Sequence, residues 1–337
     1  MTEDYTRRSH SPKIGIIGTG FAARQRAQTI LQDPGAELVA AVGHSPAGRE
    51  AFCREFQIPV WEDPATLWEN AAIDLVFIST INQDHANLVR TALERNLHVV
   101  VEYPLALDLA EARELVNLAQ ERRCLLHVEH IELLSGIHQS LRSGLAQVGC
   151  VHLVRYSTIN AKPPEPGRWT FSPELFGFPL FGAVSRINRL IDLLGPIEQV
   201  FCENRYFGLS ESGKVHFYRG CLCLANLRFT SGAIGEIVYA KGEGCWRSQM
   251  QLELVGSTGA LIHDGERLVY LGGEGMRELD PGSKRGLFNR DTLAVLAALR
   301  EGEPLYIKPY DTLHALAVAA AAERSAQSAQ VERVETF

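Results

Sequence analysis

The sequence contains no apolar run long enough to cross a membrane. One apolar stretch, Ala315–Ala322, is short and is followed directly by Glu323 and Arg324, whereas a spanning helix needs about 20 mostly apolar residues. Residues 1–13 carry charges of both signs and lack the apolar centre of a secretory signal. We therefore expect a cytoplasmic protein with no membrane partner.

Charge and cysteine content argue against further classes of protein. The formal net charge is −7, which is unfavourable for a broad surface that binds nucleic acid or anionic lipid. The seven cysteines include no C-x-x-C spacing, and Cys221 and Cys223 lie two apart in a strand-like run. This pattern fits reduced, mostly buried thiols in a cytoplasmic protein with no nucleic-acid partner.

Common catalytic and metal motifs are missing or incomplete. No G-x-S-x-G sequence of a serine hydrolase is present. His127-Val-Glu-His130 contains metal-capable side chains without the helical i, i+4 spacing of a zinc motif, so we expect no metal. Gly208–Lys214 resembles a phosphate-binding P-loop, but Val215 follows where Ser or Thr is required, which favours a surface hairpin turn.

A dinucleotide fingerprint is present near the start of the chain. Lys13–Ile17 is predicted to be a buried strand, and the G-x-G-x-x-A pattern follows it directly. The first glycine permits a tight turn, the second lets the backbone approach a pyrophosphate, and the alanine keeps the next helix close to the strand. The N-terminus of that helix would face the phosphates. The predicted phosphate-binding residues are Gly18, Thr19, Gly20, Phe21, Ala22 and Ala23.

Periodicity predicts two domains of different sheet type, and the chain is long enough for both. Strands and helices alternate up to about residue 128, which indicates a parallel sheet, whereas period-two patterns dominate after Gly149. The expected fold class is α/β plus α+β. An N-terminal Rossmann dinucleotide-binding domain would cover residues 11–128. A C-terminal domain with a large, mostly antiparallel sheet covered by helices would cover residues 129–337. Such a sheet needs only one covered face, so a monomer and a homodimer formed through it both fit.

The end of the second predicted strand favours NADPH over NADH. NAD-binding folds usually place Asp or Glu there to hold the ribose hydroxyls. Here His44 and Ser45 follow the strand, with Arg49 one turn into the next helix. With no carboxylate to repel a 2′-phosphate, and with two side chains able to donate to it, NADPH is the expected cofactor and NADH a weaker one. The alternative is that His44 and Arg49 are only solvated.

Several motifs resemble the glucose–fructose oxidoreductase and inositol dehydrogenase superfamily over nearly the whole chain. They are the fingerprint, the loop Thr80-x-Asn82-x-x-His85, the strand end Glu102-x-Pro104 and the C-terminal sheet. The resemblance implies that Thr80, Asn82, His85 and Glu102 bind the cofactor.

The residues that handle protons in sugar-oxidising members of this superfamily are replaced here. Tyr103 stands in place of a lysine, Ser185 in place of an aspartate and Arg189 in place of a histidine. Removal of a hydroxyl proton needs a group that titrates near neutrality. The replacements therefore argue against a sugar dehydrogenase.

The same replacements resemble the biliverdin reductase family, in particular its cyanobacterial members. The resemblance implies hydride transfer from NADPH to the central C10 methine of biliverdin, with a proton added at a pyrrole nitrogen to give bilirubin. It also implies catalytic roles for Tyr103, Arg186 and Arg189. The residues implied to contact the substrate are His130, Trp169, Phe176 and Phe178. The stretches that carry this resemblance are 101–107, 126–134, 155–158, 168–170 and 176–189.

Two questions stay open at the level of sequence. The resemblance makes Arg186 the proton donor, yet an arginine pKa above about 12 makes it a weak acid. Stabilisation of the developing anion by Arg186, with water as the proton source, is an equal hypothesis. Other functions are also compatible with these residues. They are another NAD(P)-dependent oxidoreductase of the superfamily acting on a different planar or unsaturated substrate, and a non-catalytic nucleotide-sensing regulator on the same scaffold.

Overall fold

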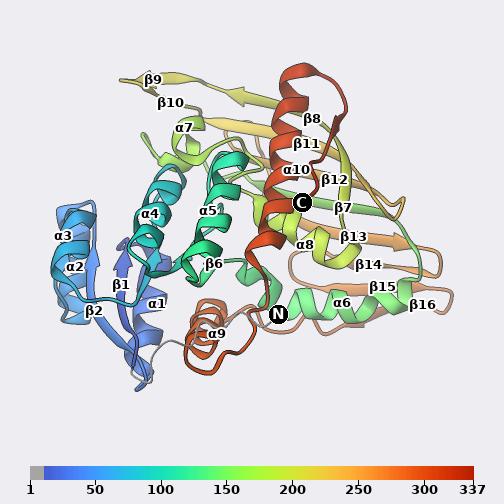
Figure 1. Ribbon diagram of the computed structural model, residues 1–337. Helices are drawn as coiled ribbons and strands as arrows, with labels where there is room; N and C mark the ends of the chain where they lie inside the picture. Colours follow the sequence, from blue (N-terminus) through green and yellow to red (C-terminus); the bar gives the residue numbers. More distant parts are fainter. Residues whose placement is uncertain (1–10) are drawn as a thin grey trace. The chain divides into compact units, whose positions relative to one another are not determined.

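The computed structural model describes residues 11–337 and divides them into two compact units (Figure 1). The first unit runs to Leu134 and also includes Gly286–Tyr310, and the second comprises Ser135–Arg285 and Asp311–Phe337. We expected two contiguous domains, 11–128 and 129–337. The structure differs because helix α9 (Leu287–Glu301) packs against α1 (Phe21–Gln32) of the first unit, where both contribute to one apolar core.

The first unit contains a six-stranded parallel sheet in the order β3-β2-β1-β4-β5-β6. Every residue of β4 and nearly every residue of β1 and β5 is buried, as expected for apolar strands covered by helices on both faces. The predicted Rossmann sheet is thereby confirmed. Its strands are β1 (Lys13–Ile17), β2 (Glu37–Val42), β3 (Val60–Trp61), β4 (Leu75–Ile78), β5 (His98–Val101) and β6 (Leu126–Val128). Its helices besides α1 and α9 are α2 (Pro46–Phe56), α3 (Pro64–Asn70), α4 (Asn82–Glu94), α5 (Leu109–Arg122) and the 3-10 helix η1 (Ile131–Leu134).

The second unit contains a nine-stranded sheet in the order β16-β15-β14-β13-β7-β12-β11-β8-β17. Only the pair β7 and β12 is parallel, so the prediction of a mostly antiparallel sheet is confirmed. Its strands are β7 (Val151–Asn160), β8 (Ile197–Phe207), β11 (Gly220–Phe229), β12 (Ile234–Gly242), β13 (Gln249–Gly256), β14 (Gly259–His263), β15 (Leu268–Gly272), β16 (Gly275–Leu279) and β17 (Glu332–Arg333).

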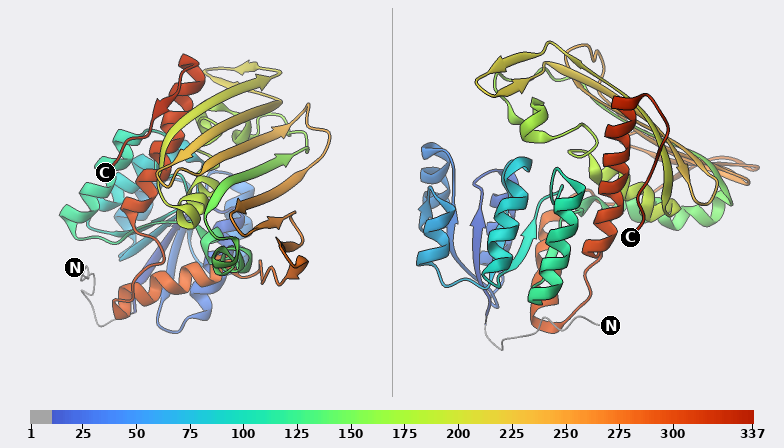
Figure 2. Two further views of the ribbon diagram at one scale, coloured as in Figure 1. Left: turned by 90° about the vertical axis from the view of Figure 1, so that its right-hand side faces the viewer. Right: turned by 45° about the horizontal axis from the view of Figure 1, so that its top comes forward.

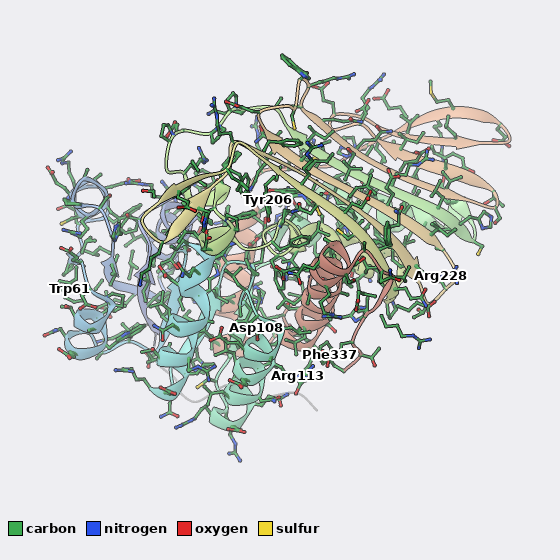
Figure 3. The ribbon with its side chains drawn as sticks, turned by 90° about the horizontal axis from the view of Figure 1, so that it is seen from above. Trp61, Asp108, Arg113, Tyr206, Arg228 and Phe337 are labelled. Atoms are coloured by element: carbon green, nitrogen blue, oxygen red, sulfur yellow. The ribbon has the colours of Figure 1, made fainter. Side chains whose placement is uncertain are left out.

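Helices cover one face of this sheet (Figure 2). They are α6 (Gly136–Val148), α8 (Val184–Leu194) and α10 (Pro309–Ser328). Along β11, Cys221 and Cys223 point to the covered face and are fully buried, whereas Leu222 and Arg228 lie exposed on the other face (Arg228 is labelled in Figure 3). A homodimer formed through the exposed face stays a prediction.

The second unit also contains several short elements. Helix α8 begins at Val184 and is preceded by the short helices η2 (Trp169–Phe171) and α7 (Pro173–Phe176). The P-loop-like segment forms the predicted hairpin, with strands β9 (Ser210–Ser212) and β10 (Val215–Phe217). Within residues 11–337, no helix combines the length and apolarity needed to cross a bilayer.

Candidate functional site

The turn after β1 has the backbone shape of a dinucleotide fingerprint. Gly18 adopts a φ of +125°, and its N–H donates to the carbonyl oxygen of Val42 at 2.8 Å. A Cβ at Gly18 would collide with the carbonyl oxygen of Ser79. A side chain would therefore meet both backbone strain and a steric clash, so the fold itself requires glycine at this position.

Gly20 differs because the fold does not require it. Its φ is −79°, a value open to any residue, and a Cβ there would meet no atom within 4 Å among the described residues. It precedes α1, whose N-terminus has no side-chain cap. Ala23 is buried, Thr19 is half-buried and Phe21 is 71% exposed. The arrangement leaves room for a phosphate group beside free helix N–H groups, which is where such groups bind.

The end of β2 carries the residues predicted to select the cofactor. His44 and Ser45 are exposed, and the Ser45 hydroxyl caps α2 by accepting a backbone N–H at 3.1 Å. Arg49 donates to the His44 carbonyl oxygen at 2.8 Å and forms an ion pair with Glu62 at 2.9 Å. Glu62 directly follows Trp61, which Figure 3 labels. Arg49 therefore lies beside the predicted 2′-phosphate position, but Glu62 partly neutralises its charge.

The loops after β4 and β5 are held together by His85. Its Nδ1 lies 2.8 Å from the carbonyl oxygen of Pro104, and burial lowers the pKa of the ring. The neutral ring donates Nδ1–H to that carbonyl. Asn82 is buried at the start of α4, and Thr80 is half-buried. The structure thus supports a loop-bracing role for His85, and the cofactor contacts of these residues stay predictions.

A network of buried charges includes Glu102, the residue directly after β5. Sequence reasoning missed this network. Arg26 on α1 is fully buried and bonds to Glu102 at 2.9 Å and to Asp291 on α9 at 2.6 Å. Asp291 also bonds to Nε2 of His127 at 2.7 Å. Burial alone would raise the pKa of Asp291. The charges and hydrogen bonds of Arg26 and His127 outweigh this effect and lower the pKa. Glu102, predicted to bind the cofactor, is therefore also a partner of Arg26.

Tyr103 and His130 form a stacked pair at the same edge of the sheet. Their ring centroids lie 5.7 Å apart with an interplanar angle of 5°. The backbone N–H of His130 donates to the Tyr306 hydroxyl at 3.1 Å. Its two ring nitrogens are buried and bond to no group in the described part of the chain. Burial, and then the charge of His127, lower the pKa of His130 to about 3, so its ring is neutral and can donate to or accept from a ligand.

In the second unit, α8 holds both predicted catalytic arginines against β7. Nε of Arg186 donates to the Thr158 hydroxyl at 3.3 Å, and its Cζ lies 5.5 Å from the centre of the Tyr239 ring. Nη1 of Arg189 donates to the Tyr156 hydroxyl at 3.0 Å. Arg186 is half-buried, whereas Arg189 is only 3% exposed. The two guanidinium groups therefore have different access to a ligand, and Arg186 has the greater.

Asp192 on α8 pairs with two groups on α6 rather than with Arg189. Its Oδ2 lies 2.7 Å from Nε2 of His138 and 3.5 Å from Arg142. The hydrogen bond from His138 is the main cause of the lowered pKa of Asp192. This pairing joins α8 to α6 and so fixes the helix that carries the arginines.

The predicted aromatic contacts lie in and after the short helices η2 and α7. The ring centroids of Trp169 and Phe176 are 5.9 Å apart. Phe176 and Phe178 are 7% and 8% exposed, and Trp169 is half-buried. A Cβ at Gly182 would collide with the Phe176 ring, so that glycine makes room for it. Of the three aromatic residues, Trp169 is the most accessible, and all three substrate contacts stay predictions.

Comparison with known proteins identifies similar proteins. The crystal structure of biliverdin reductase from Synechocystis sp. PCC 6803, in complex with biliverdin and NADP+, matches with a TM-score of 0.90. It is 41% identical, and the match covers 94% of this chain and 99% of that one. Mouse biliverdin reductase A is 32% identical over 201 residues, which is 57% of this chain and 62% of the mouse protein. The human protein is 34% identical over 128 residues, 38% of this chain and 40% of the human one.

The family models cover almost the entire described chain. The model described as the oxidoreductase family, NAD-binding Rossmann fold, matches residues 12–130. The model described as the oxidoreductase family, C-terminal alpha/beta domain, matches residues 145–336. Together with the fingerprint geometry and the nine-stranded sheet, these matches show that the chain belongs to the GFO/IDH/MocA oxidoreductase family.

Proposed function

We propose that this protein is an NADPH-dependent biliverdin reductase that delivers hydride to C10 of biliverdin, with a proton added at a pyrrole nitrogen. The observation that carries the proposal is the replacement of the proton-handling side chains of sugar chemistry by Tyr103, Ser185 and Arg189. An alcohol substrate requires a base for its hydroxyl proton. A conjugated bilin with two carboxylates requires cations and an apolar surface, and the second unit supplies both types of group.

The first unit fits the cofactor. When bound, NADPH supplies the hydride. The open space at Gly20 and the uncapped start of α1 suit the pyrophosphate. Arg49, with exposed His44 and Ser45 close by, suits a 2′-phosphate. NADH lacks that phosphate and is expected to bind more weakly.

Arg186 has the geometry for the electrostatic part of the reaction. Hydride arrival leaves negative charge on the pyrrole system, and a fixed cation stabilises it most if little reorganisation is needed. Thr158 and the Tyr239 ring hold the guanidinium group in place. Arg189 is buried and bonded to Tyr156, so its role is to support this helix face and to add positive potential.

In the first unit, Tyr103 and His130 provide polar groups and flat rings that suit a bilin. The Tyr103 hydroxyl can donate a hydrogen bond to a bilin, and the parallel rings provide a flat surface. The unbonded ring nitrogens of His130 can take a polar ligand group. The proton comes either from Arg186 or from a water that Arg186 orients. The high arginine pKa favours water.

The decisive experiment is to mix the protein with biliverdin and NADPH. Saturation of the central bridge shortens the conjugated path, so the long-wavelength absorbance should give way to a bilirubin band at shorter wavelength. Arg186→Ala should slow this change, while Arg228→Ala, on the exposed face of β11, serves as the matched control. No spectral change with the unmodified protein would refute the proposal.

A further inference from the structure

Lys241 on β12 is a buried cation that has no assigned role in the proposed reaction. It is 6% exposed, and its Nζ donates to the carbonyl oxygen of Thr170. Four aromatic rings surround the ammonium group and come from η2, α7, β12 and the residue after β10. The distances from Nζ to the ring centres are 3.6 Å for Phe176, 4.9 Å for Phe171, 5.5 Å for Tyr239 and 5.6 Å for Tyr218.

This aromatic box is firmly built into the sheet. Tyr218 is 1% exposed, and its ring packs against Tyr206 of β8, labelled in Figure 3, with centroids 4.7 Å apart. Phe171 also contacts Tyr218, with a centroid distance of 5.5 Å. Lys241 therefore cannot move far toward solvent, and its charge is held in place within the second unit.

The charged neighbours of Lys241 are positive. The Tyr239 ring lies 5.5 Å from Nζ of Lys241 and 5.5 Å from Cζ of Arg186, so the two cations share one ring. Burial first, and then Arg186 and Arg168, lower the pKa of Lys241 to about 7, against an opposite effect of the Cys221 thiol. Within residues 11–337, no carboxylate forms an ion pair with Lys241.

Such a charge is a cost to the folded protein. Cation–π contacts offset part of the desolvation, but a buried ammonium beside like charges remains unfavourable. An apolar side chain of similar length would fill the same space without this cost. The charge would be useful if an anion bound nearby, because an anion would relieve the repulsion among Lys241, Arg186 and Arg168.

We propose that Lys241 is a specificity-determining residue whose buried ammonium adds to the positive potential of Arg186 and Arg168 and selects a bilin with ionised propionates. This inference rests on the proposed function and deepens it. The ammonium group of Lys241 attracts the propionates by long-range electrostatics, with the Tyr239 and Phe176 rings beside it. Direct contact with the bilin is therefore not required. A cation and a carboxylate about 10 Å apart at an effective dielectric constant of about 20 change affinity roughly tenfold.

The test compares biliverdin with its uncharged dimethyl ester. The preference is the ratio of kcat/KM for the acid to kcat/KM for the ester, measured in the unmodified protein, in Lys241→Met and in Lys214→Met. Lys214 lies exposed in the β9–β10 turn of the same unit, so its substitution removes the same charge from a site that water screens. At pH 6, where Lys241 is charged, the preference should fall about tenfold in Lys241→Met and stay within twofold in Lys214→Met.

A structural role would give a different result. Because the folded-state pKa of Lys241 lies below the ordinary 10.5, burial of its charge lowers stability most at pH values below about 7. Lys241→Met should therefore unfold at the same temperature or a higher one at pH 6. A lower unfolding temperature together with an unchanged acid-to-ester preference would show that Lys241 serves only the fold, and would overturn the inference.

A second measurement tests the inference even if Lys241→Met fails to fold. Lysine labelled with ¹³C at Cε reports the titration of Lys241 in the unmodified protein by NMR. Biliverdin should raise the midpoint, because an anion favours the charged form, and the dimethyl ester should not. Equal midpoints with both ligands would overturn the role of Lys241 and leave the proposed function standing. Absence of reduction of either compound by the unmodified protein would instead overturn the proposed function.

Discussion

Alanine substitutions at the two glycines of the fingerprint should have opposite effects: Gly20→Ala should weaken cofactor binding, and Gly18→Ala should lower stability. Gly20→Ala is the more informative change. Gly20 has a φ of −79°, and a Cβ there meets no described atom within 4 Å. Alanine is a poorer N-cap than glycine, which costs roughly 0.5–1 kcal/mol. It also restricts the unfolded chain, which stabilises the protein by about 0.4–1 kcal/mol. These effects nearly cancel, so the free energy of unfolding without cofactor should change by less than about 1 kcal/mol.

Binding of NADPH should respond much more strongly. The added methyl group occupies the space in which the backbone would approach the pyrophosphate. We expect the Kd for NADPH to rise at least tenfold, equivalent to about 1.4 kcal/mol. Fluorescence titration with NADPH measures this effect, and denaturant unfolding without cofactor measures stability.

Gly18→Ala is the matched comparison. At Gly18 the φ is +125° and a Cβ collides with the Ser79 carbonyl oxygen. This variant should therefore lose stability, by about 1–2 kcal/mol or more. The reasoning fails if Gly20→Ala binds NADPH as tightly as the unmodified protein does, or if it unfolds as readily as Gly18→Ala.

Three further predictions concern charged side chains. Arg186→Ala should lower kcat for biliverdin reduction about a hundredfold or more while the Kd for NADPH stays within twofold, and an unchanged kcat in stopped-flow assays would contradict its role. Asp291→Asn should destabilise the fold by about 3–5 kcal/mol, because it breaks a buried pair with Arg26. The pKa of Asp291 is lowered on folding. The ionised carboxylate therefore stabilises the fold at pH values above its ordinary pKa of about 4, and this stabilisation is lost as the pH falls below that value. A plot of unfolding free energy against pH should have a flatter acid limb for the variant. Glu62→Gln removes the exposed partner of Arg49 and should tighten NADPH binding by about 0.5 kcal/mol without changing NADH binding; equal effects on both cofactors in calorimetry would show that Arg49 does not face the 2′-phosphate.

The cofactor end of the candidate site could be predicted from sequence because its determinants are local. The strand, the tight turn at Gly18, the open position at Gly20 and the start of the helix lie within a few consecutive residues, where backbone sterics and apolar periodicity set the structure. The same holds for both sheets, since strand periodicity is a property of each segment. The Rossmann and mostly antiparallel sheets were therefore both predicted correctly.

Groups that depend on distant segments could not be predicted in this way. Arg26 and Asp291 are 265 residues apart and meet only because α9 returns to the first unit. Similarly, the rings around Lys241 come from separate segments of the second unit.

The sequence alone thus determined the kind of fold, the nucleotide fingerprint and the replacement of the sugar-oxidising residues. Only the tertiary structure decided which charges are buried and which partners they meet. The physical reason is that strand, turn and helix preferences act over a few neighbouring residues, whereas desolvation and charge pairing depend on every element that packs around a group.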